Sequence, residues 1–108
     1  MFARRVTINL KPNSVSEFTR KLEEEVIPML QKQPGFRDEL TFVATGDNEA
    51  LAISLWDRKE NAEAYSTTKY SEVVRMLGTV VEGTPVVQSG EVSNSTFHKI
   101  GPLATAKV

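Results

Sequence analysis

Three features of the sequence predict an α+β fold with an antiparallel sheet. The chain has 108 residues, of which 40% are hydrophobic and 25% charged, so it fits one ordinary globular domain with one modest core. Four segments alternate apolar and polar residues with period two, which is typical of strands. Two other segments carry apolar residues at spacings of three and four, which is typical of amphipathic helices. Their order, β-α-β-β-α-β, predicts a ferredoxin-like domain.

The first strand is predicted over residues 2–10. One face of this strand holds Phe2, Arg4, Val6, Ile8 and Leu10. Pro12 ends the strand, because proline cannot continue a central ladder.

A helix is predicted to follow, opened by a capping box of Ser14 and Glu17. Its apolar stripe runs through Val15, Phe18, Leu22, Val26 and Leu30. Pro28 lacks the N–H that the Glu24 carbonyl would accept, so we expect a kink or an irregular last turn. Pro34-Gly35 ends the helix.

The next two strands are predicted over residues 36–45 and 50–56, joined as a hairpin through Gly46-Asp47-Asn48. The more apolar face of this pair is expected to pack under the helices; it holds Leu40, Phe42, Leu51, Ile53 and Leu55. The opposite face of the sheet is mixed; its large or apolar members are Val43, Ala52, Trp56, Val87 and Phe97.

A second helical region is predicted to open with a capping box of Asp57 and Glu60. The hydroxyl residues Ser66-Thr67-Thr68 predict a break near its middle, because their side chains compete for backbone partners. The last strand is predicted from Pro85 to about Phe97, with Gly90 as a candidate bulge. We therefore expect one domain over residues 1–98 and a C-terminal tail over 99–108.

Two helices cannot cover both faces of the predicted sheet. The second face is either solvated, as antiparallel sheets permit, or docks on a second copy of the chain. Under the second alternative, the expected dimer contacts are Val43, Trp56 and Phe97.

Composition excludes several function classes. The formal net charge of −1 provides no basic excess for nucleic acid. The chain has no cysteine and one histidine, His98, so it lacks a disulfide framework, a Cys nucleophile and a His pair for zinc or iron. The N-terminal residues lack the continuous apolar run of a signal peptide, and no segment resembles a membrane span. We therefore expect a cytoplasmic protein that does not bind membranes.

Four short motifs occur in order along the chain: Leu10-Lys11-Pro12, Glu17-Phe18, Gln33-Pro34-Gly35-Phe36 and the run from Leu55 to Ala62. Together they resemble the antibiotic biosynthesis monooxygenase (ABM) family, and the resemblance covers residues 2–97. It implies a dimeric α+β barrel, in which the sheets of a homodimer face each other. It also implies a small-molecule pocket in each subunit, between the helices and the sheet.

Some members of this family oxidise aromatic phenols to quinones with molecular oxygen and no cofactor. The resemblance to this branch implies catalytic roles for Asn61, Tyr65, Tyr70 and Arg75. A cation such as Arg75 or Arg4 would favour the phenolate that reacts with oxygen. The pocket for the small aromatic ligand is expected along Arg4, Val6 and Phe42.

Each of these residues also has a purely structural interpretation. Asn61 can bond the helix end, the tyrosines can be core rings, and Arg75 can be a surface residue paired with Glu72 or Glu82. Arg4 can extend to water from a strand end.

Two alternative functions remain open at this point. One is a non-catalytic dimer that binds a small ligand or acts in stress. The other, disfavoured, is haem degradation. The resemblance places Arg5 or Val6, Tyr65 and Arg75 where that branch uses Asn, Trp and His, and arginine offers iron no neutral lone pair.

Overall fold

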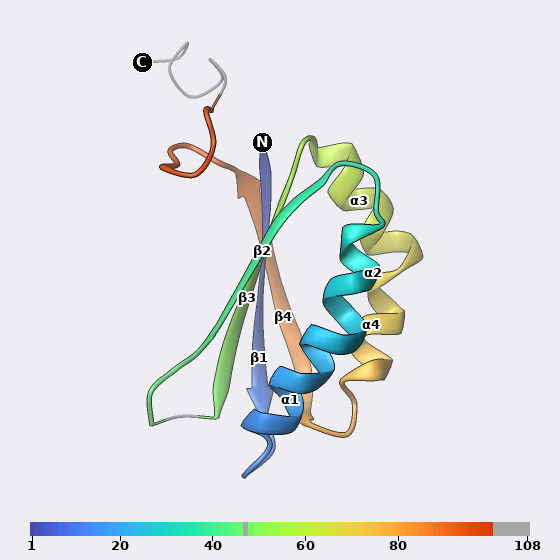
Figure 1. Ribbon diagram of the computed structural model, residues 1–108, viewed down its shortest axis with the longest axis vertical. Coiled ribbons are helices and arrows are strands. Elements are labelled where there is room, and N and C mark those ends of the chain that lie inside the picture. The colour runs from blue at the N-terminus through green and yellow to red at the C-terminus, as the bar shows by residue number, and fades with distance from the viewer. Residues whose placement is uncertain (47, 101–108) are drawn as a thin grey trace.

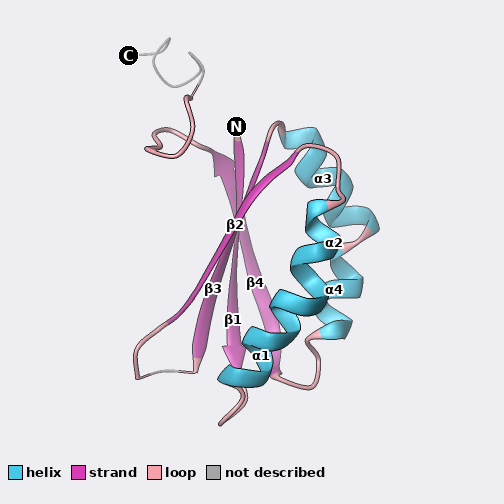
Figure 2. Ribbon diagram, in the orientation of Figure 1, coloured by secondary structure: helices cyan, strands magenta, loops and turns pink. Residues whose placement is uncertain are grey.

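The computed structural model describes residues 1–46 and 48–100, and in it four strands form one antiparallel sheet. The elements in chain order are β1 (Phe2–Leu10), α1 (Val15–Lys21), the π-helical turn η1 (Leu22–Val26), α2 (Ile27–Gln31), β2 (Phe36–Val43), β3 (Glu49–Trp56), α3 (Lys59–Thr68), α4 (Tyr70–Met76) and β4 (Val81–Glu91). The strand order is β2-β3-β1-β4, and the helices lie along one face of the sheet (Figures 1 and 2). This confirms the predicted α+β, ferredoxin-like order.

Among the described residues, no helix has the length and apolar character needed to cross a bilayer. The tail predicted over 99–108 falls largely outside the description, because residues 101–108 are not part of it.

Strand β1 has the face pattern that the sequence predicts. Its side chains alternate between buried and more exposed along the whole strand, and the buried set contains Arg4 as well as the apolar residues. Since β1 lies between β3 and β4, its buried face is at the centre of the sheet under the helices.

The first helical region is continuous but irregular near Pro28, as predicted. The residues before the proline widen into the π-helical turn η1, where the Ile27 N–H donates to the Leu22 carbonyl five residues back. The predicted capping box is wrong: no side chain caps α1, and the Ser14 hydroxyl is directed to the Pro12 carbonyl instead.

The second helical region is broken between α3 and α4, and this too was predicted. The Thr68 hydroxyl donates to the Ala64 carbonyl at 2.6 Å, and the Thr67 hydroxyl donates to the Glu63 carbonyl at 3.1 Å. Lys69 then leaves the helical conformation. The second capping box is also wrong, because Asp57 forms an ion pair with Arg37 of β2 rather than capping α3.

Strand β4 differs from its prediction at both ends. It begins at Val81 and ends at Glu91, short of Phe97. The register shift falls between the pairs Thr7–Val86 and Asn9–Glu82, next to Gly83 with its positive φ of 72°. Gly90, the predicted bulge, pairs regularly with Ala3.

The two faces of the β2–β3 hairpin are the reverse of the prediction. Trp56 is 0% exposed and packs under the helices, where its ring stacks on Tyr65 at 5.1 Å and meets Phe36 edge-on at 5.5 Å. Val43 also packs against this core. Both residues were therefore wrongly expected as dimer contacts.

The reversal has a physical reason. Alternation identifies two faces but does not say which one the helices cover, and the more apolar face is here the uncovered one. A register shift between Phe36 and Asp38 further places Phe36, together with its partner Trp56, on the helix side.

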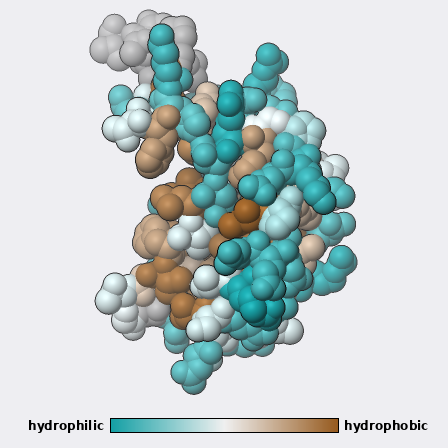
Figure 3. Space-filling model, in the orientation of Figure 1, coloured by the Kyte–Doolittle hydropathy of each residue, from teal (hydrophilic) through white to brown (hydrophobic). Residues whose placement is uncertain are grey.

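We call the uncovered side of the sheet the open face. Its apolar residues are Leu40, Phe42, Leu51, Ile53, Leu55 and Val86. Figure 3 shows hydrophobic side chains gathered on the left of the molecule, over the strands and away from the helices. Phe97 is 77% exposed and lies beside this face, where it borders a groove with Leu40, Ile53 and Leu55.

We expect Trp56→Ala to lower the free energy of unfolding by about 3–5 kcal/mol, because it removes a fully buried ring. Val15→Ala is the control, because Val15 is an exposed apolar residue on α1, away from the open face, and its truncation should change stability by less than about 0.5 kcal/mol. Urea unfolding followed by circular dichroism measures both. Equal losses for the two variants would contradict the assignment of Trp56 to the core.

Candidate functional site

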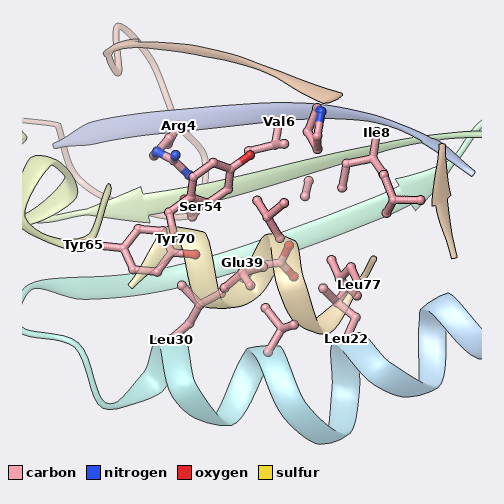
Figure 4. A pocket seen from close by; sticks show the side chains of 16 residues that line it. Arg4, Val6, Ile8, Leu22, Leu30, Glu39, Ser54, Tyr65, Tyr70 and Leu77 are labelled. Carbon is pink, nitrogen blue, oxygen red and sulfur yellow. The ribbon is translucent and has the colours of Figure 1, made fainter. Parts of the chain in front are cut away.

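A cavity lies between the central strands and the helices (Figure 4). Its lining is mostly apolar, and the apolar part comes from β1, η1, α2, β3, α4 with the residue after it, and β4. The apolar members are Val6, Ile8, Leu22, Val26, Leu30, Ala52, Val73, Val74, Leu77, Val81 and Pro85. The volume that the centres of water molecules can occupy in the cavity is about 50 Å³. This volume leaves room for a few waters or one small group. The cavity is therefore formed but small.

Arg4 of β1 brings a positive charge into this cavity. Arg4 is 5% exposed, and its guanidinium carbon lies 4.2 Å from the ring centroid of Tyr70 and 5.3 Å from that of Tyr65. Among residues 1–46 and 48–100, no carboxylate forms an ion pair with it. The cation–π contacts of the desolvated guanidinium compensate part of its lost hydration, by about 2 kcal/mol. Because no carboxylate neutralises it, the charge remains available to an anion.

The break between α3 and α4 brings the two tyrosines to Arg4. Residues five apart on one continuous helix point about 140° apart, so Tyr65 and Tyr70 would not share a face of an unbroken helix. With the break at Lys69, their ring centroids are 6.3 Å apart. Figure 4 shows both tyrosines beside Arg4.

Both tyrosines stay protonated near neutral pH. Burial raises the pKa of Tyr65 from 10.0 to about 12, against a smaller opposing effect of the Arg4 charge. Burial raises the pKa of Tyr70 for the same reason, again opposed by Arg4. Neither ring therefore supplies an anion to Arg4. The buried Tyr70 hydroxyl donates no hydrogen bond to a described residue, so its proton is available to a ligand.

Glu39 is a cavity residue that the sequence analysis missed. It lies on β2 opposite Ser54 of β3, and both line the cavity. Burial raises the pKa of Glu39, while a hydrogen bond from the Thr41 hydroxyl lowers it in part. Its position could have been inferred from the sequence, because Glu39 alternates in phase with Val43 along β2, but that face of the hairpin was expected to lie away from the helices.

The structure brings together only part of the predicted site. Arg4, Val6, Tyr65 and Tyr70 all line the cavity. Phe42 does not, since it lies half exposed on the open face.

Asn61 and Arg75 also lie away from the cavity lining. The Asn61 side chain packs on Gly35, where an added Cβ would come within 2.3 Å of its Oδ1. Gly35 has a positive φ of 75° and begins the turn into β2, so Asn61 supports that turn. Arg75 is exposed on α4. The resemblance implied a site of Asn61, Tyr65, Tyr70 and Arg75, and of these four residues only the two tyrosines line the cavity.

The raised pKa of Tyr65 predicts a loss of stability at high pH. Between pH 10 and 12 the unfolded chain loses the Tyr65 proton while the folded chain keeps it. The unfolded state then binds fewer protons, so the free energy of unfolding falls as pH rises. Tyr65→Phe should make this fall shallower, as measured by urea unfolding across the interval. Parallel curves for the two proteins would contradict the burial of this hydroxyl.

Comparisons with known proteins identify the fold. No family model matches the chain, and no curated protein matches it in sequence. Solved structures do match in three dimensions. One is a monooxygenase of Streptomyces coelicolor from the gene ActVA-Orf6, solved with the ligand nanaomycin D: it has a TM-score of 0.75 and 14% identity, over 91% of this chain and 92% of that one.

Two further structures have a similar likeness. A protein of unknown function from Nitrosomonas europaea has a TM-score of 0.73 at 13% identity, over 93% of this chain and 95% of that one. A structure named antibiotic biosynthesis monooxygenase has a TM-score of 0.69 at 14% identity, over 85% and 98%. At these identities the likeness establishes the fold alone. The chain therefore has the fold of the antibiotic biosynthesis monooxygenases, as its motifs indicated.

Proposed function

We propose that the protein oxidises a small phenol with molecular oxygen in the Arg4 cavity, without a bound cofactor. The observation that carries the proposal is the Arg4 guanidinium, which is buried in an apolar cavity without a carboxylate partner among the described residues. A phenol that reacts with oxygen must first become an electron-rich phenolate, and a buried cation favours that anion. The monooxygenase-like fold supports the same interpretation.

The reaction balances without an external reductant. A phenol with a free para carbon takes one oxygen atom at that carbon and becomes a quinone, and the second oxygen atom leaves as water. The substrate supplies all four electrons. Arg4 holds the phenolate oxygen, the hydroxyls of Tyr65 and Tyr70 orient the ring, and the apolar lining protects the radical pair from water.

The cavity volume bears on substrate size. Because it has room for a few waters only, a single-ring phenol fits with less rearrangement than a polycyclic one. A polycyclic phenol would require the side chains of α4 and β4 to move outward.

We also propose that two copies pair through their open faces. The helices leave this face uncovered, and Leu40 and Phe42 are 58% and 49% exposed on it. Contiguous exposed apolar surface of this kind marks an interaction site. A two-fold axis lets the same face of a second copy provide the missing cover. This arrangement replaces Trp56 and Val43 with open-face residues as the contacts, and it keeps Phe97.

Arg4→Met should lower kcat/KM for oxygen uptake by about 100-fold or more, the usual cost of one lost donor to an oxyanion. The assay follows oxygen in air with a single-ring phenol that has a free para carbon, and with dihydroxynaphthalene and anthrone as larger substrates, with and without chelators. Uptake should be unaffected by chelators and reduced in Tyr65→Phe. The matched control is Arg75→Ala, which removes an exposed arginine and should keep wild-type activity.

The same assay separates the alternatives. A flat oxygen trace across a broad panel of phenols would contradict the enzyme and favour a binding protein with the same cavity. Tight stoichiometric haem binding with a Soret shift would instead favour the haem-degrading function.

Light scattering should give a mass of about twice 12.0 kDa for the wild type. Leu40→Asp should give a monomer, because it places a charge on the apolar surface of the proposed contact. Val15→Asp is the matched control: Val15 is exposed on α1, on the helix side, and its substitution should leave the dimer intact. A monomeric wild type at micromolar concentration would contradict the pairing.

A further inference from the structure

Glu39 is a charged group inside the cavity that the proposed function leaves without a role. The residue lies on the helix-facing side of β2 and lines the same cavity as Arg4 (Figure 4). It has no ion pair with any described residue, and its hydrogen bond comes from the Thr41 hydroxyl. A carboxylate in an apolar lining costs stability unless it is protonated or paired, so this position needs a reason.

The ionisable residues of the cavity lining are few. Among the described residues they are Arg4 of β1, Glu39 of β2, Tyr65 of α3 and Tyr70 of α4. Both tyrosines keep their protons near neutral pH, and arginine does not release its own. Glu39 is therefore the lining residue that can accept a proton.

The net charge of the cavity indicates which form of a ligand it can accept. Ionised Arg4 and Glu39 together carry no net charge. An anionic ligand entering alone would leave one net negative charge in an apolar cavity, which is unfavourable. A neutral weak acid that gives its proton to Glu39 leaves the total at zero, with the new anion beside Arg4.

We propose that Glu39 is the proton acceptor for a small planar weak acid of the phenol type, which then stays bound as its anion on Arg4. The inference rests on the proposed function for its substrate class. In the step, the ligand O–H bond breaks and its electron pair stays on the oxygen. The proton bonds to a Glu39 carboxylate oxygen, and no electron is transferred.

The environment of Glu39 suits this role. Burial raises its pKa, so its carboxylate is a stronger base than an exposed one, and a base nearer the operating pH transfers protons more effectively. Glu39 also comes from a different strand than Arg4, so the acceptor and the anion site approach the ligand from separate positions.

The test uses 4-nitrophenol, whose phenolate form absorbs at longer wavelength than the phenol. At a pH below the ligand's own pKa, the wild type should give the phenolate band on binding, with little proton release to a weakly buffered indicator dye. Glu39→Gln keeps the shape of the side chain but accepts no proton. It should give the same band and release one proton per bound phenolate. Arg4→Met should give no phenolate band.

Glu82→Gln is the matched control, because Glu82 is an exposed strand glutamate outside the cavity lining; it should behave as the wild type. Thermal melting confirms that each variant is folded. A wild type that releases one proton per phenolate, as Glu39→Gln does, would overturn the role of Glu39. A wild type with no phenolate band would overturn the anion site itself.

These outcomes are separate from the proposed oxidation, because the assay needs no oxygen chemistry. Suppose that the wild type gives a phenolate band without releasing a proton, and that no phenol causes oxygen uptake. The proposed oxidation would then be contradicted, and the role of Glu39 as proton acceptor would be supported. Oxygen uptake by the wild type, together with the release of one proton per bound phenolate, would support the oxidation and contradict the role of Glu39.

Discussion

The buried positive charge of Arg4 is the constraint on which the rest of the site depends. A guanidinium that is 5% exposed needs partners, and the fold provides two aromatic rings but no carboxylate among the described residues. Irregularities in the two helical regions bring the tyrosines and part of the apolar lining to the cavity that holds Arg4. The threonine-driven break after Thr68 turns Tyr65 and Tyr70 toward the same guanidinium, and the π-helical turn before Pro28 lies where Leu22 and Val26 line the cavity.

Local sequence patterns predicted the order of the elements and the irregularities of both helical regions. The alternation along β1 placed Arg4 on the buried face, proline chemistry indicated the disturbed first helix, and hydroxyl residues indicated the break in the second. These features depend on residues close in the chain, so their physics is visible in the sequence. The two capping boxes failed for different reasons: Asp57 pairs with the tertiary partner Arg37 of β2, whereas the Ser14 hydroxyl is directed to the Pro12 carbonyl two residues back.

Which face of the β2–β3 hairpin is covered was not predictable from alternation. The choice is made by packing: Trp56, with Phe36 and Tyr65, fills the space under the helices, while the more apolar face is left open. That one reversal moved Phe42 out of the cavity and hid Glu39 from the sequence analysis. The family resemblance implied Asn61 and Arg75 as site residues, but Asn61 packs against the turn at Gly35 and Arg75 is exposed on α4.

The central claim is that the cavity holds an anion on Arg4, and a crystal structure of the protein with a bound phenol tests it most directly. The account predicts the phenolic oxygen within hydrogen-bond distance of the Arg4 guanidinium, with the ring between the tyrosines and the apolar side chains of η1 and α2. An Arg4 side chain paired with a carboxylate of a second copy, or a ligand bound only in the groove beside Phe97, would contradict it.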